Sequence, residues 1–442
     1  MPPEPALPLL ARAPGEVVCR RGTRPVTRGQ FLAEAMALAA RLPEHGHVMN
    51  LCGDRYRTLL AFAAALLRGQ VTLLCADRSP HRLRALAGLY PDAYAIVDQE
   101  IEAPLPVLRL EEVEGVRDGD AAMPAIPAGR IAAIAFTSGS TGEPTAHAKP
   151  WGALVTAAEA AARRFRLRAQ DGPPATIIAT VPPQHMYGFE TTIMLPLQSA
   201  VACLAGETFY PSDVFEAMAS VPGRRILVTT PLQLRALFAA GQAPPALEAV
   251  ISATAPLAAS LAASVEQGWG VPVLEIYGAT EAGSIASRRT TEGDGWLPYD
   301  GTELRPGAVA VPGLGEIPLA DAVEPLADGR FRLLGRRADV VKLGGRRASL
   351  AELNRLLAEV EGVEDGVFVA PEDLESNPAA RLTAYVVAPG RSAEEILGAL
   401  RERMDPIFLP RPVVMVRALP RDRLGKLPRS ALAELRRAGA GG

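Results

Sequence analysis

Short apolar segments alternate with longer amphipathic segments from residue 131 onward. Each apolar run precedes a turn of small or polar residues, and the clearest runs are 131–136, 176–181, 226–230, 249–252 and 273–276. Amphipathic stretches such as 153–165 follow these turns. Strands that alternate with helices predict parallel sheets with helices on both faces. Ligands bind such folds at the carboxyl ends of the strands, where the polar turns of this chain lie.

The pattern changes after about residue 335. Ser349, followed three residues later by Glu352, predicts a capping box at the start of a helix. A helical stripe follows at Leu350, Leu353, Leu357 and Val360, and strands at 366–370, 382–388 and 413–419 flank a helix at 393–404. We therefore expect a large α/β N-terminal domain, 1–338, with parallel-rich sheets covered by helices, and a small mobile α+β C-terminal domain, 339–442.

Length and hydropathy agree with a globular protein of more than one domain. The chain has 442 residues, too many for one ordinary core, and 48% of them are hydrophobic. The longest apolar run, 59–67, stops at Arg68 and is far shorter than a membrane span of about 18 residues. The first 16 residues lack the basic start and clean apolar core of a signal peptide. The sequence predicts a soluble, cytoplasmic protein without a membrane span.

Charge and cysteine content exclude several functional classes. Lys plus Arg total 46 and Asp plus Glu total 49, so the net charge of -3 argues against a dominant nucleic-acid-binding role. The cysteines are widely spaced and form no CxxC pair, and they are Cys19, Cys52, Cys75 and Cys203. This spacing suits a reducing compartment and argues against a zinc site or a disulfide scaffold.

A TSGSTG hexapeptide is the strongest local motif. Its residues are Thr137, Ser138, Gly139, Ser140, Thr141 and Gly142. The two glycines allow a tight turn, and the hydroxyls and exposed amides can bind phosphate oxygens. A Ser/Gly-rich surface loop is the alternative interpretation. The chain contains no Walker GxxxxGK[ST], no GxGxxG after a strand and no GxSxG, which disfavours Walker, Rossmann and α/β-hydrolase sites.

Three weaker motifs follow along the chain. YGATE, residues 277–281, combines an aromatic ring, a hydroxyl and a carboxylate that can hold Mg²⁺, but a strand-end turn explains it equally well. GRRAD, residues 335–339, with Lys342 and two glycines after it, is also compatible with a charged linker. LGKLPR, residues 424–429, is by itself compatible with a solvated tail.

The order and spacing of these four motifs resemble the acyl-adenylate-forming superfamily, which includes acyl- and aryl-CoA synthetases, luciferase-like enzymes and nonribosomal peptide adenylation domains. The resemblance covers roughly residues 131–432. The hexapeptide resembles the family's TSGSTGxPKG, but Thr145 and Ala146 replace the Lys-Gly pair. Lys149 lies four residues beyond Thr145, and whether it supplies the missing charge stays open.

Further positions match the family in order. His185 lies in PPQHMYG, which resembles P-x-x-H-x-x-G, and Ala253 and Thr254 lie in SATAPL, which resembles the loop beside adenine. Asp321 precedes Gly329 by eight residues, the family's spacing from the ribose-binding Asp to a turn glycine. The resemblance also places Arg336 at a second nucleotide contact, Asp339 at a hinge, Gly345 and Arg347 in the next loop, and Lys426 at the catalytic lysine.

The resemblance implies ATP-dependent activation of a carboxylic acid, with Mg²⁺ as cofactor. Lys426, Thr280 and His185 are the implied catalytic residues, and Glu281 the metal ligand. The implied nucleotide-binding residues are the hexapeptide with Ala253, Thr254, Tyr277, Gly278, Asp321 and Arg336. The expected acid pocket is lined by His185, Tyr187, Gly188, Gly278, Ala279, Ala282 and Gly283, whose small residues leave room for a flat ring or a medium acyl chain.

The sequence leaves two thiol acceptors open, an acyl carrier protein and free CoA. The FTSGSTGEP segment and the KPWG after it are similar to those of AMP-ligases in aryl-polyene and xanthomonadin-type pigment pathways, which load a hydroxybenzoate-like acid onto an acyl carrier protein. On this resemblance we rank an acyl carrier protein above free CoA. Residues 335–442 hold 18 Lys/Arg against 15 Asp/Glu, and the basic stretch 411–437 suits an acidic carrier and the phosphates of CoA alike, so charge does not decide. A third reading is a homologue that binds an acyl adenylate without turnover. The retained Lys426, Glu281 and Asp321 argue against it.

Overall fold

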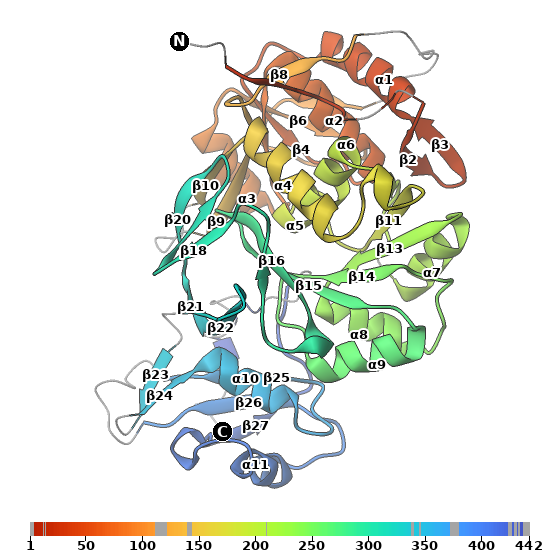
Figure 1. The fold of residues 1–442 in the computed structure, drawn as a ribbon. Coiled ribbons are helices and arrows are strands. Elements are labelled where there is room, and N and C mark those ends of the chain that lie inside the picture. The colour runs from red at the N-terminus through yellow and green to blue at the C-terminus, as the bar shows by residue number, and fades with distance from the viewer. Residues whose placement is uncertain are drawn as a thin grey trace.

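A computed structural model describes residues 4–11, 13, 15–110, 122–138, 144–208, 210–336, 340–343, 346–371, 380–422, 427, 431, 434 and 435. A large α/β body carries the N-terminal part of the chain, and the C-terminal part, drawn in blue, lies at one end of it (Figure 1). The expected boundary at 338/339 falls among residues outside the described ranges, so the domain limits stay a prediction.

A six-stranded sheet forms the first part of the large body. Its order is β10 (Pro144–Pro150), β9 (Ile131–Ser138), β5 (Val71–Leu73), β4 (His47–Asn50), β6 (Ala93–Val97) and β7 (Val107–Arg109). All neighbouring pairs are parallel except β9 and β10, which form an antiparallel hairpin. The sequence pattern missed β10, because its seven residues, PTAHAKP, form neither an apolar run nor a regular alternation of apolar and polar positions.

A nine-stranded sheet forms the second part. Its order is β17 (Leu297–Pro298), β16 (Gly283–Arg289), β15 (Val273–Ala279), β14 (Ala249–Ser252), β13 (Arg224–Thr229), β11 (Ala175–Ala179), β12 (Val201–Leu204), β2 (Val17–Arg21) and β3 (Arg24–Thr27). The pairs from β15 to β2 are parallel and the outer pairs are antiparallel. The predicted parallel-rich sheets are thereby confirmed.

Helices cover and separate the two sheets. They are α1 (Arg28–Arg41), α2 (Arg55–Arg68), α3 (Pro80–Leu89), α4 (Trp151–Arg164), α5 (Met186–Phe189), α6 (Leu195–Gln198), α7 (Pro211–Ser220), α8 (Pro231–Ala239) and α9 (Ala259–Trp269). A π-helical turn, Glu190–Met194, joins α5 to α6, and short 3₁₀ turns lie at Ala169–Asp171 and Thr290–Glu292. Within the described part of the chain, no helix is both long and apolar enough to cross a membrane.

Helix α2 explains the longest apolar run of the sequence. It contacts β4 and β5 of the six-stranded sheet and β12 of the nine-stranded sheet. Residues 59–66 are all buried, so this helix is apolar all round because both sheets pack against it. Asp54 caps its first turn by accepting a hydrogen bond from Arg57 N at 2.9 Å, and Gly69 ends it in a left-handed conformation.

Three smaller sheets complete the large body. They are β18 (Glu303–Arg305), β19 (Ala308–Val311) and β20 (Gly315–Pro318) in one sheet, β21 (Asp321–Pro325) with β22 (Phe331–Arg336) in another, and β1 (Ala6–Pro8) with β8 (Ala125–Pro127) near the N-terminus. Figure 1 shows β21 and β22 between the large body and the C-terminal elements.

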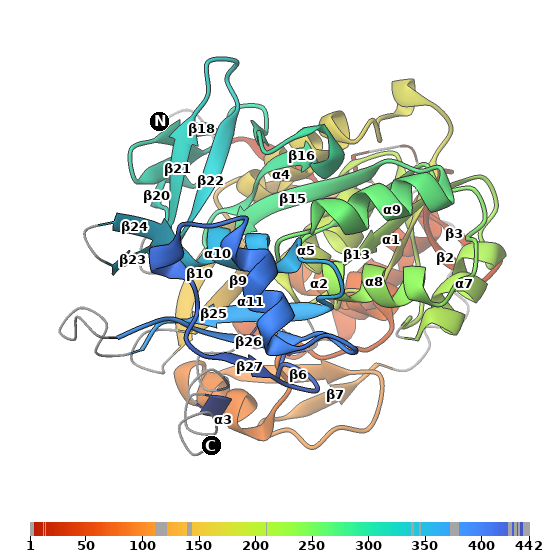
Figure 2. The same ribbon diagram turned by 90° about the horizontal axis from the view of Figure 1, so that it is seen from below.

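The C-terminal part is α+β, as the sequence predicts. It contains β23 (Val340–Leu343), β24 (Arg346–Ser349), α10 (Leu350–Ala358), β25 (Asp365–Val369), β26 (Thr383–Val387), α11 (Ala393–Arg401), the 3₁₀ turn Pro406–Phe408 and β27 (Val413–Met415). One apolar cluster of this part draws only on residues from Val341 onward, including Leu353, Leu357 and Leu400. Seen from below, α10 and α11 lie on the same side of strands β25 to β27 (Figure 2).

The expected capping box at Ser349 is wrong in one detail. Ser349 does cap α10, but its hydroxyl accepts from Ala351 N at 3.2 Å, and Glu352 pairs with Arg355 instead of returning to the cap. The Arg355 guanidinium competes for the Glu352 carboxylate, because residues three apart meet on a helix surface. A true capping box forms at α11, between Ser392 and Glu395.

Candidate active site

The predicted site positions converge on one edge of the nine-stranded sheet. Strands β11, β14 and β15 are parallel, so their carboxyl ends face the same side. His185 follows β11, Thr254 follows β14, and Tyr277 lies near the end of β15. Residues that are far apart in the chain therefore meet at the edge where such sheets bind ligands.

Two predicted nucleotide positions are in direct contact. Tyr277 Oη donates a hydrogen bond to Asp321 Oδ2 at 2.8 Å across a separation of 44 residues. The Tyr277 ring is buried and packs against Trp296 and Phe331, with ring centroids 5.7 and 5.9 Å apart. Asp321 is also paired along the strand with Arg336, so β21 and β22 bring both predicted ribose contacts together.

The loop after β14 carries backbone strain. Thr254 has a φ of 82°, a left-handed conformation that a β-branched residue rarely adopts. Such a conformation costs on the order of 1–3 kcal/mol and is found most often at functional sites. Ala253, just before it, is buried. The strain agrees with the predicted place of this loop beside the nucleotide base.

The phosphate loop is the turn of the β9–β10 hairpin. Thr137 and Ser138 end β9, whereas Gly139, Ser140, Thr141 and Gly142 lie outside the described residues. His147 Nε2 lies 2.9 Å from Thr137 Oγ1, which ties β10 to the first residue of the motif. Burial lowers the pKa of His147, the nearby Glu281 carboxylate raises it and the Lys149 ammonium lowers it further. His147 is therefore a hairpin residue that contacts Thr137 and is close enough to Glu281 for the carboxylate to affect its pKa.

The YGATE segment forms a tight turn between β15 and β16. Ala282 N donates to Ala279 O at 3.1 Å, and this bond leaves Thr280 and Glu281 at the turn, both partly buried. A Cβ atom on Gly278 would lie 2.5 Å from Gly283 O, and Gly283 itself has a φ of +78°. Both glycines are therefore required by the close approach and the left-handed backbone.

Lys149 reaches this turn from the neighbouring sheet. Its Nζ donates to Glu281 O at 2.6 Å, and only 1% of the residue is exposed. Burial lowers the pKa of Lys149 to about 8, while the Glu190 and Glu281 carboxylates act in the opposite direction. Glu190 in turn accepts from Ser284 N at 3.1 Å and from Ser284 Oγ at 2.5 Å. Burial raises the pKa of Glu190, and the Ser284 hydrogen bonds and Lys149 partly offset this rise.

The H-x-x-G segment builds a short helix beside this cluster. His185 Nδ1 accepts from Tyr187 N at 3.3 Å and so caps α5. A Cβ atom on Gly188 would lie 2.0 Å from Pro182 O, so the glycine is needed for backbone contact. Tyr187 Oη donates its proton to Ile251 O at 2.8 Å. The hydroxyl can therefore only accept a hydrogen bond from a bound acid.

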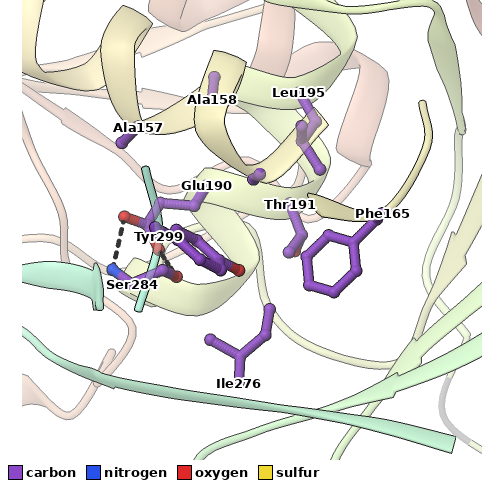
Figure 3. A pocket seen from close by; sticks show the side chains of 10 residues that line it. Ala157, Ala158, Phe165, Glu190, Thr191, Leu195, Ile276, Ser284 and Tyr299 are labelled. Atoms are coloured by element: carbon purple, nitrogen blue, oxygen red, sulfur yellow. Dashed lines mark hydrogen bonds between the residues drawn. The ribbon is translucent and has the colours of Figure 1, made fainter. Parts of the chain in front are cut away.

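A narrow pocket lies between α4, the π-helical turn and β16 (Figure 3). Its lining is mostly apolar and includes three alanines of α4, and its residues are Ala157, Ala158, Ala161, Phe165, Glu190, Thr191, Leu195, Ile276, Ser284 and Tyr299. Figure 3 shows the Ser284 and Glu190 side chains in contact beside the Tyr299 ring. The cavity volume is about 10 Å³, close to what one water needs, so a larger ligand must displace side chains.

The pocket contains a polar group with no protein partner. Tyr299 is 3% exposed, and no described residue accepts from or donates to its hydroxyl. Burial raises the pKa of Tyr299 above its ordinary value, and the Glu190 carboxylate adds to this rise. A buried polar atom without a partner is uncommon and is explained by a ligand or water.

Sequence reasoning missed several residues of this region. Glu190, Ser284, Tyr299 and His147 were not predicted, and none of the expected lining residues lines the pocket of Figure 3. The expected residues are instead chain neighbours of the lining: Gly283 precedes Ser284, and Gly188 lies two residues before Glu190. A carboxylate inside the apolar run 186–197 is the signal that could have identified Glu190.

The C-terminal candidates are only partly described. Asp339 and Lys426 lie outside the described residues, and the side chain of Arg336 does too. Leu427, the residue after Lys426, packs in an apolar cluster with Val414 and Leu435. A Cβ atom on Gly335 would lie 2.0 Å from Ser349 Oγ, so β22 passes directly against the start of α10.

The side chains near Glu281 determine whether Mg²⁺ fits at this place. Among the residues that the structure describes, no three His, Cys, Asp or Glu side chains are grouped to hold a metal. Mg²⁺ in nucleotide-dependent enzymes is typically held by one or two carboxylates together with substrate phosphates. Glu281 beside the phosphate hairpin fits that arrangement.

Comparison with known proteins gives the family that the sequence motifs resemble. The model for "AMP-binding enzyme" matches residues 10–314. A 4-coumarate–CoA ligase of Rhodobacter capsulatus is 30% identical over 300 residues, covering 66% of this chain and 74% of the relative. An isonitrile lipopeptide synthase of Mycobacterium tuberculosis is 39% identical over 109 residues, covering 24% of this chain and 4% of the relative.

A solved structure supports the fold. The anthranilate CoA ligase AuaEII in complex with anthranoyl-AMP superposes with a TM-score of 0.82 at 16% identity and covers 99% of each chain. The family model covers more than half of the chain and the superposition covers both parts of it. The chain therefore belongs to the AMP-binding enzyme family and is an AMP-forming acid–thiol ligase of the adenylate-forming superfamily.

Proposed function

We propose that this protein uses ATP to convert a carboxylic acid, aryl or acyl, to an acyl adenylate and then transfers the acyl group to the phosphopantetheine thiol of an acyl carrier protein. The observation that carries the proposal is the contact between Tyr277 and Asp321 at the carboxyl edge of the parallel strands, beside the phosphate hairpin and the Glu281 turn. The cytoplasmic location stays a prediction.

In the first half-reaction, a carboxylate oxygen of the acid bonds to the α-phosphorus of ATP, and the bond to pyrophosphate breaks. The reaction needs positioning and charge neutralisation more than covalent help from the protein. The hexapeptide amides and Thr280 bind phosphate oxygens, Asp321 and Arg336 hold the ribose, and Tyr277 lies beside the adenosine. Mg²⁺ held by Glu281 would supply further neutralisation of phosphate charge. Lys426 bridges the acid and the α-phosphate.

In the second half-reaction, the thiol sulfur attacks the acyl carbon, AMP leaves and a thioester forms. One observation favours a carrier protein as acceptor, the local match to a lipopeptide synthase, whereas the basic excess of residues 335–442 suits a carrier protein and CoA alike. The alternative, free CoA, is favoured by the longer match to a CoA ligase. The third candidate is a homologue that holds an acyl adenylate without turnover.

One set of assays separates these functions. ATP–pyrophosphate exchange with a panel of aryl and acyl acids tests activation, and absence of exchange with every acid would favour the non-catalytic homologue. The active acid is then offered with holo carrier protein or with CoA, and mass spectrometry identifies the product. We expect the loaded carrier to form at lower acceptor concentration. Acyl-CoA as the sole product would assign the CoA ligase function instead.

The pocket of Figure 3 is our candidate for the far end of the acid site. Its three alanines and the Phe165 and Tyr299 rings suit a flat ring, and the Tyr299 hydroxyl offers a hydrogen bond to a polar ring substituent. This arrangement favours an aryl acid over a plain acyl chain, since a polar group left unpaired by the ligand would cost affinity.

Replacing Tyr299 by Phe should stabilise the free protein and weaken acid binding. Removing a buried hydroxyl without a partner should raise the free energy of unfolding by about 1 kcal/mol. Loss of its hydrogen bond to the acid should raise the KM for the acid roughly tenfold. Urea denaturation and exchange kinetics measure the two effects.

Tyr94→Phe is the matched control. The Tyr94 hydroxyl is equally buried but donates to Gln70 Oε1 at 2.8 Å, outside the site. The control should lose about 1 kcal/mol of stability and keep its KM. If Tyr299→Phe also left the KM unchanged, the hydroxyl would not contact the acid.

We further propose that residues 339–442 form a lid domain that changes orientation between the two half-reactions. The separate apolar cluster of this part supports the proposal, as does the close passage of β22 along α10. Lys426 belongs to this part, so it can reach the acid only when the lid is closed.

Asp339→Pro should separate the two half-reactions. Proline holds φ near -65° and removes the freedom of a hinge. We expect adenylate formation to stay within a few-fold of the native rate and thiol transfer to fall by at least tenfold. Asp339→Ala, which leaves φ free, should retain both half-reactions. Equal loss of both in the proline variant would contradict a hinge at this position.

A further inference from the structure

Lys149 occupies the strand that follows a phosphate loop without a lysine. The loop position that carries Lys in related motifs is Thr145 in this chain, and Lys149 was the candidate substitute. In the β9–β10 hairpin, Thr145 pairs with Thr137, next to the loop, whereas Lys149 pairs with Ala133. Four residues of strand separate the two positions by about 13 Å. Lys149 is therefore displaced along the strand, away from the loop.

The contacts of Lys149 point to the Glu281 turn instead. Its ammonium donates to Glu281 O at 2.6 Å and lies in the field of the Glu190 carboxylate. Strand β10 belongs to the six-stranded sheet, and the Glu281 turn joins β15 and β16 of the nine-stranded sheet. The hydrogen bond thus connects the two sheets, one carrying the phosphate hairpin and the other the predicted metal ligand.

The residue type supports a specific role. The chain has 46 Lys plus Arg but only three lysines, at 149, 342 and 426, so Lys149 is the sole lysine before residue 342. An ammonium is compact and carries three donors, whereas a guanidinium is a planar fork. A buried carbonyl and a neighbouring carboxylate in different directions suit the ammonium.

Lys149 also affects the charge of the Glu190 carboxylate. The Glu190 carboxylate lines the pocket of Figure 3, where an anionic acid is proposed to bind. An uncompensated carboxylate there would repel the substrate and would be costly to bury. The Lys149 ammonium lowers the pKa of Glu190 and so favours its charged form, and Lys149 itself is not among the residues that line the pocket.

We propose that Lys149 is a positioning residue, which fixes the Glu281 turn against the phosphate hairpin through the Glu281 carbonyl, and that it does not replace the phosphate-loop lysine. The inference rests on the proposed function, because it assigns the turn a metal-binding role in adenylation. It predicts that losing Lys149 disturbs the Mg²⁺ response more than the binding of nucleotide phosphate.

The first test is Lys149→Met, which keeps the length of the side chain and removes its charge and donors. We expect the Mg²⁺ concentration for half-maximal ATP–pyrophosphate exchange to rise roughly tenfold, as for groups that orient metal ligands. The KM for the acid should change less than this. Lys149→Arg should restore the Mg²⁺ response only in part, because a planar guanidinium in the same buried space cannot replace the compact ammonium that donates to Glu281 O.

Two double variants separate positioning from the alternatives. Adding Thr145→Lys to Lys149→Met restores a lysine at the loop, and recovery of the native Mg²⁺ response would overturn the proposal in favour of simple charge replacement. Adding Glu190→Gln removes the buried carboxylate that has lost the charge of Lys149, and it should recover the melting temperature but not the Mg²⁺ response. Recovery of both the melting temperature and the Mg²⁺ response would mean that Lys149 only balances the charge of Glu190, and it would overturn the proposal.

Measuring the native enzyme in parallel distinguishes failure of the proposed function from failure of the role proposed for Lys149. Absence of exchange by the native chain with every acid would refute the proposed function itself. Exchange by the native chain, with an unchanged Mg²⁺ response in Lys149→Met, would refute only the role of Lys149.

Discussion

Replacing Lys426 by Ala should reduce pyrophosphate release at least a hundredfold. A lysine that bridges the acid and the α-phosphate neutralises charge that develops in the transition state, and loss of such a contact costs on the order of 3 kcal/mol. Lys426 is the only lysine in the last hundred residues, where arginine otherwise supplies the positive charge. A compact charge between oxygens of two different groups favours lysine over the planar guanidinium.

The Lys426→Ala variant should still fold, bind ATP and transfer a chemically made acyl adenylate to its thiol acceptor. Transfer should persist because it uses the other orientation of the proposed lid. Arg417→Ala, at an exposed position of the same part of the chain, is the matched control and should retain exchange activity. A Lys426→Ala variant that adenylates at the native rate would remove the central residue of the proposed mechanism.

Replacing Glu281 by Ala should suppress adenylation by ten- to a hundredfold at limiting Mg²⁺ and weaken nucleotide binding much less. The turn that carries Glu281 is held by the Ala282–Ala279 backbone bond and by Lys149, and neither contact uses the carboxylate. Truncation at Cβ should therefore leave the turn in place. Exchange rates and nucleotide binding, each measured across a Mg²⁺ titration, test the expectation.

Glu303→Ala provides the matched control for Glu281. Glu303 is exposed and pairs only at the surface with Arg305, so its loss should change neither activity nor the Mg²⁺ response. Excess Mg²⁺ should partly restore the Glu281 variant. If that variant kept the native rate at limiting Mg²⁺, the assigned metal role would be wrong.

The sequence alone was sufficient for the fold class and for several central strands after residue 131, but it predicted no element of the first 130 residues. Strand 249–252 was predicted at its observed bounds, and the predicted run 273–276 is the core of β15. β14 lies between two parallel neighbours and β15 borders it, and most of their residues are buried, so mainly apolar runs mark them, with Glu275 as a buried exception. The edge strand β10 was missed because it has no such run.

Motif order also identified the chemistry without coordinates. YGATE and TSGSTG are short segments whose backbone turns need glycine and whose side chains are set by what they bind, so the residues themselves carry the signal. The hydrogen bond between Tyr277 and Asp321 brings two of the predicted nucleotide positions into contact, a pairing that the motifs did not predict.

Only the tertiary structure revealed the surroundings of Lys149, Glu190 and Tyr299. The Lys149–Glu281 contact spans 132 residues and crosses from one sheet to another, and the Glu190–Ser284 pair spans 94 residues. Hydrophobic periodicity reports that one face of an element is buried but not which distant element covers it. Lys149, which sequence spacing places near the phosphate loop, therefore contacts the Glu281 turn in the folded protein.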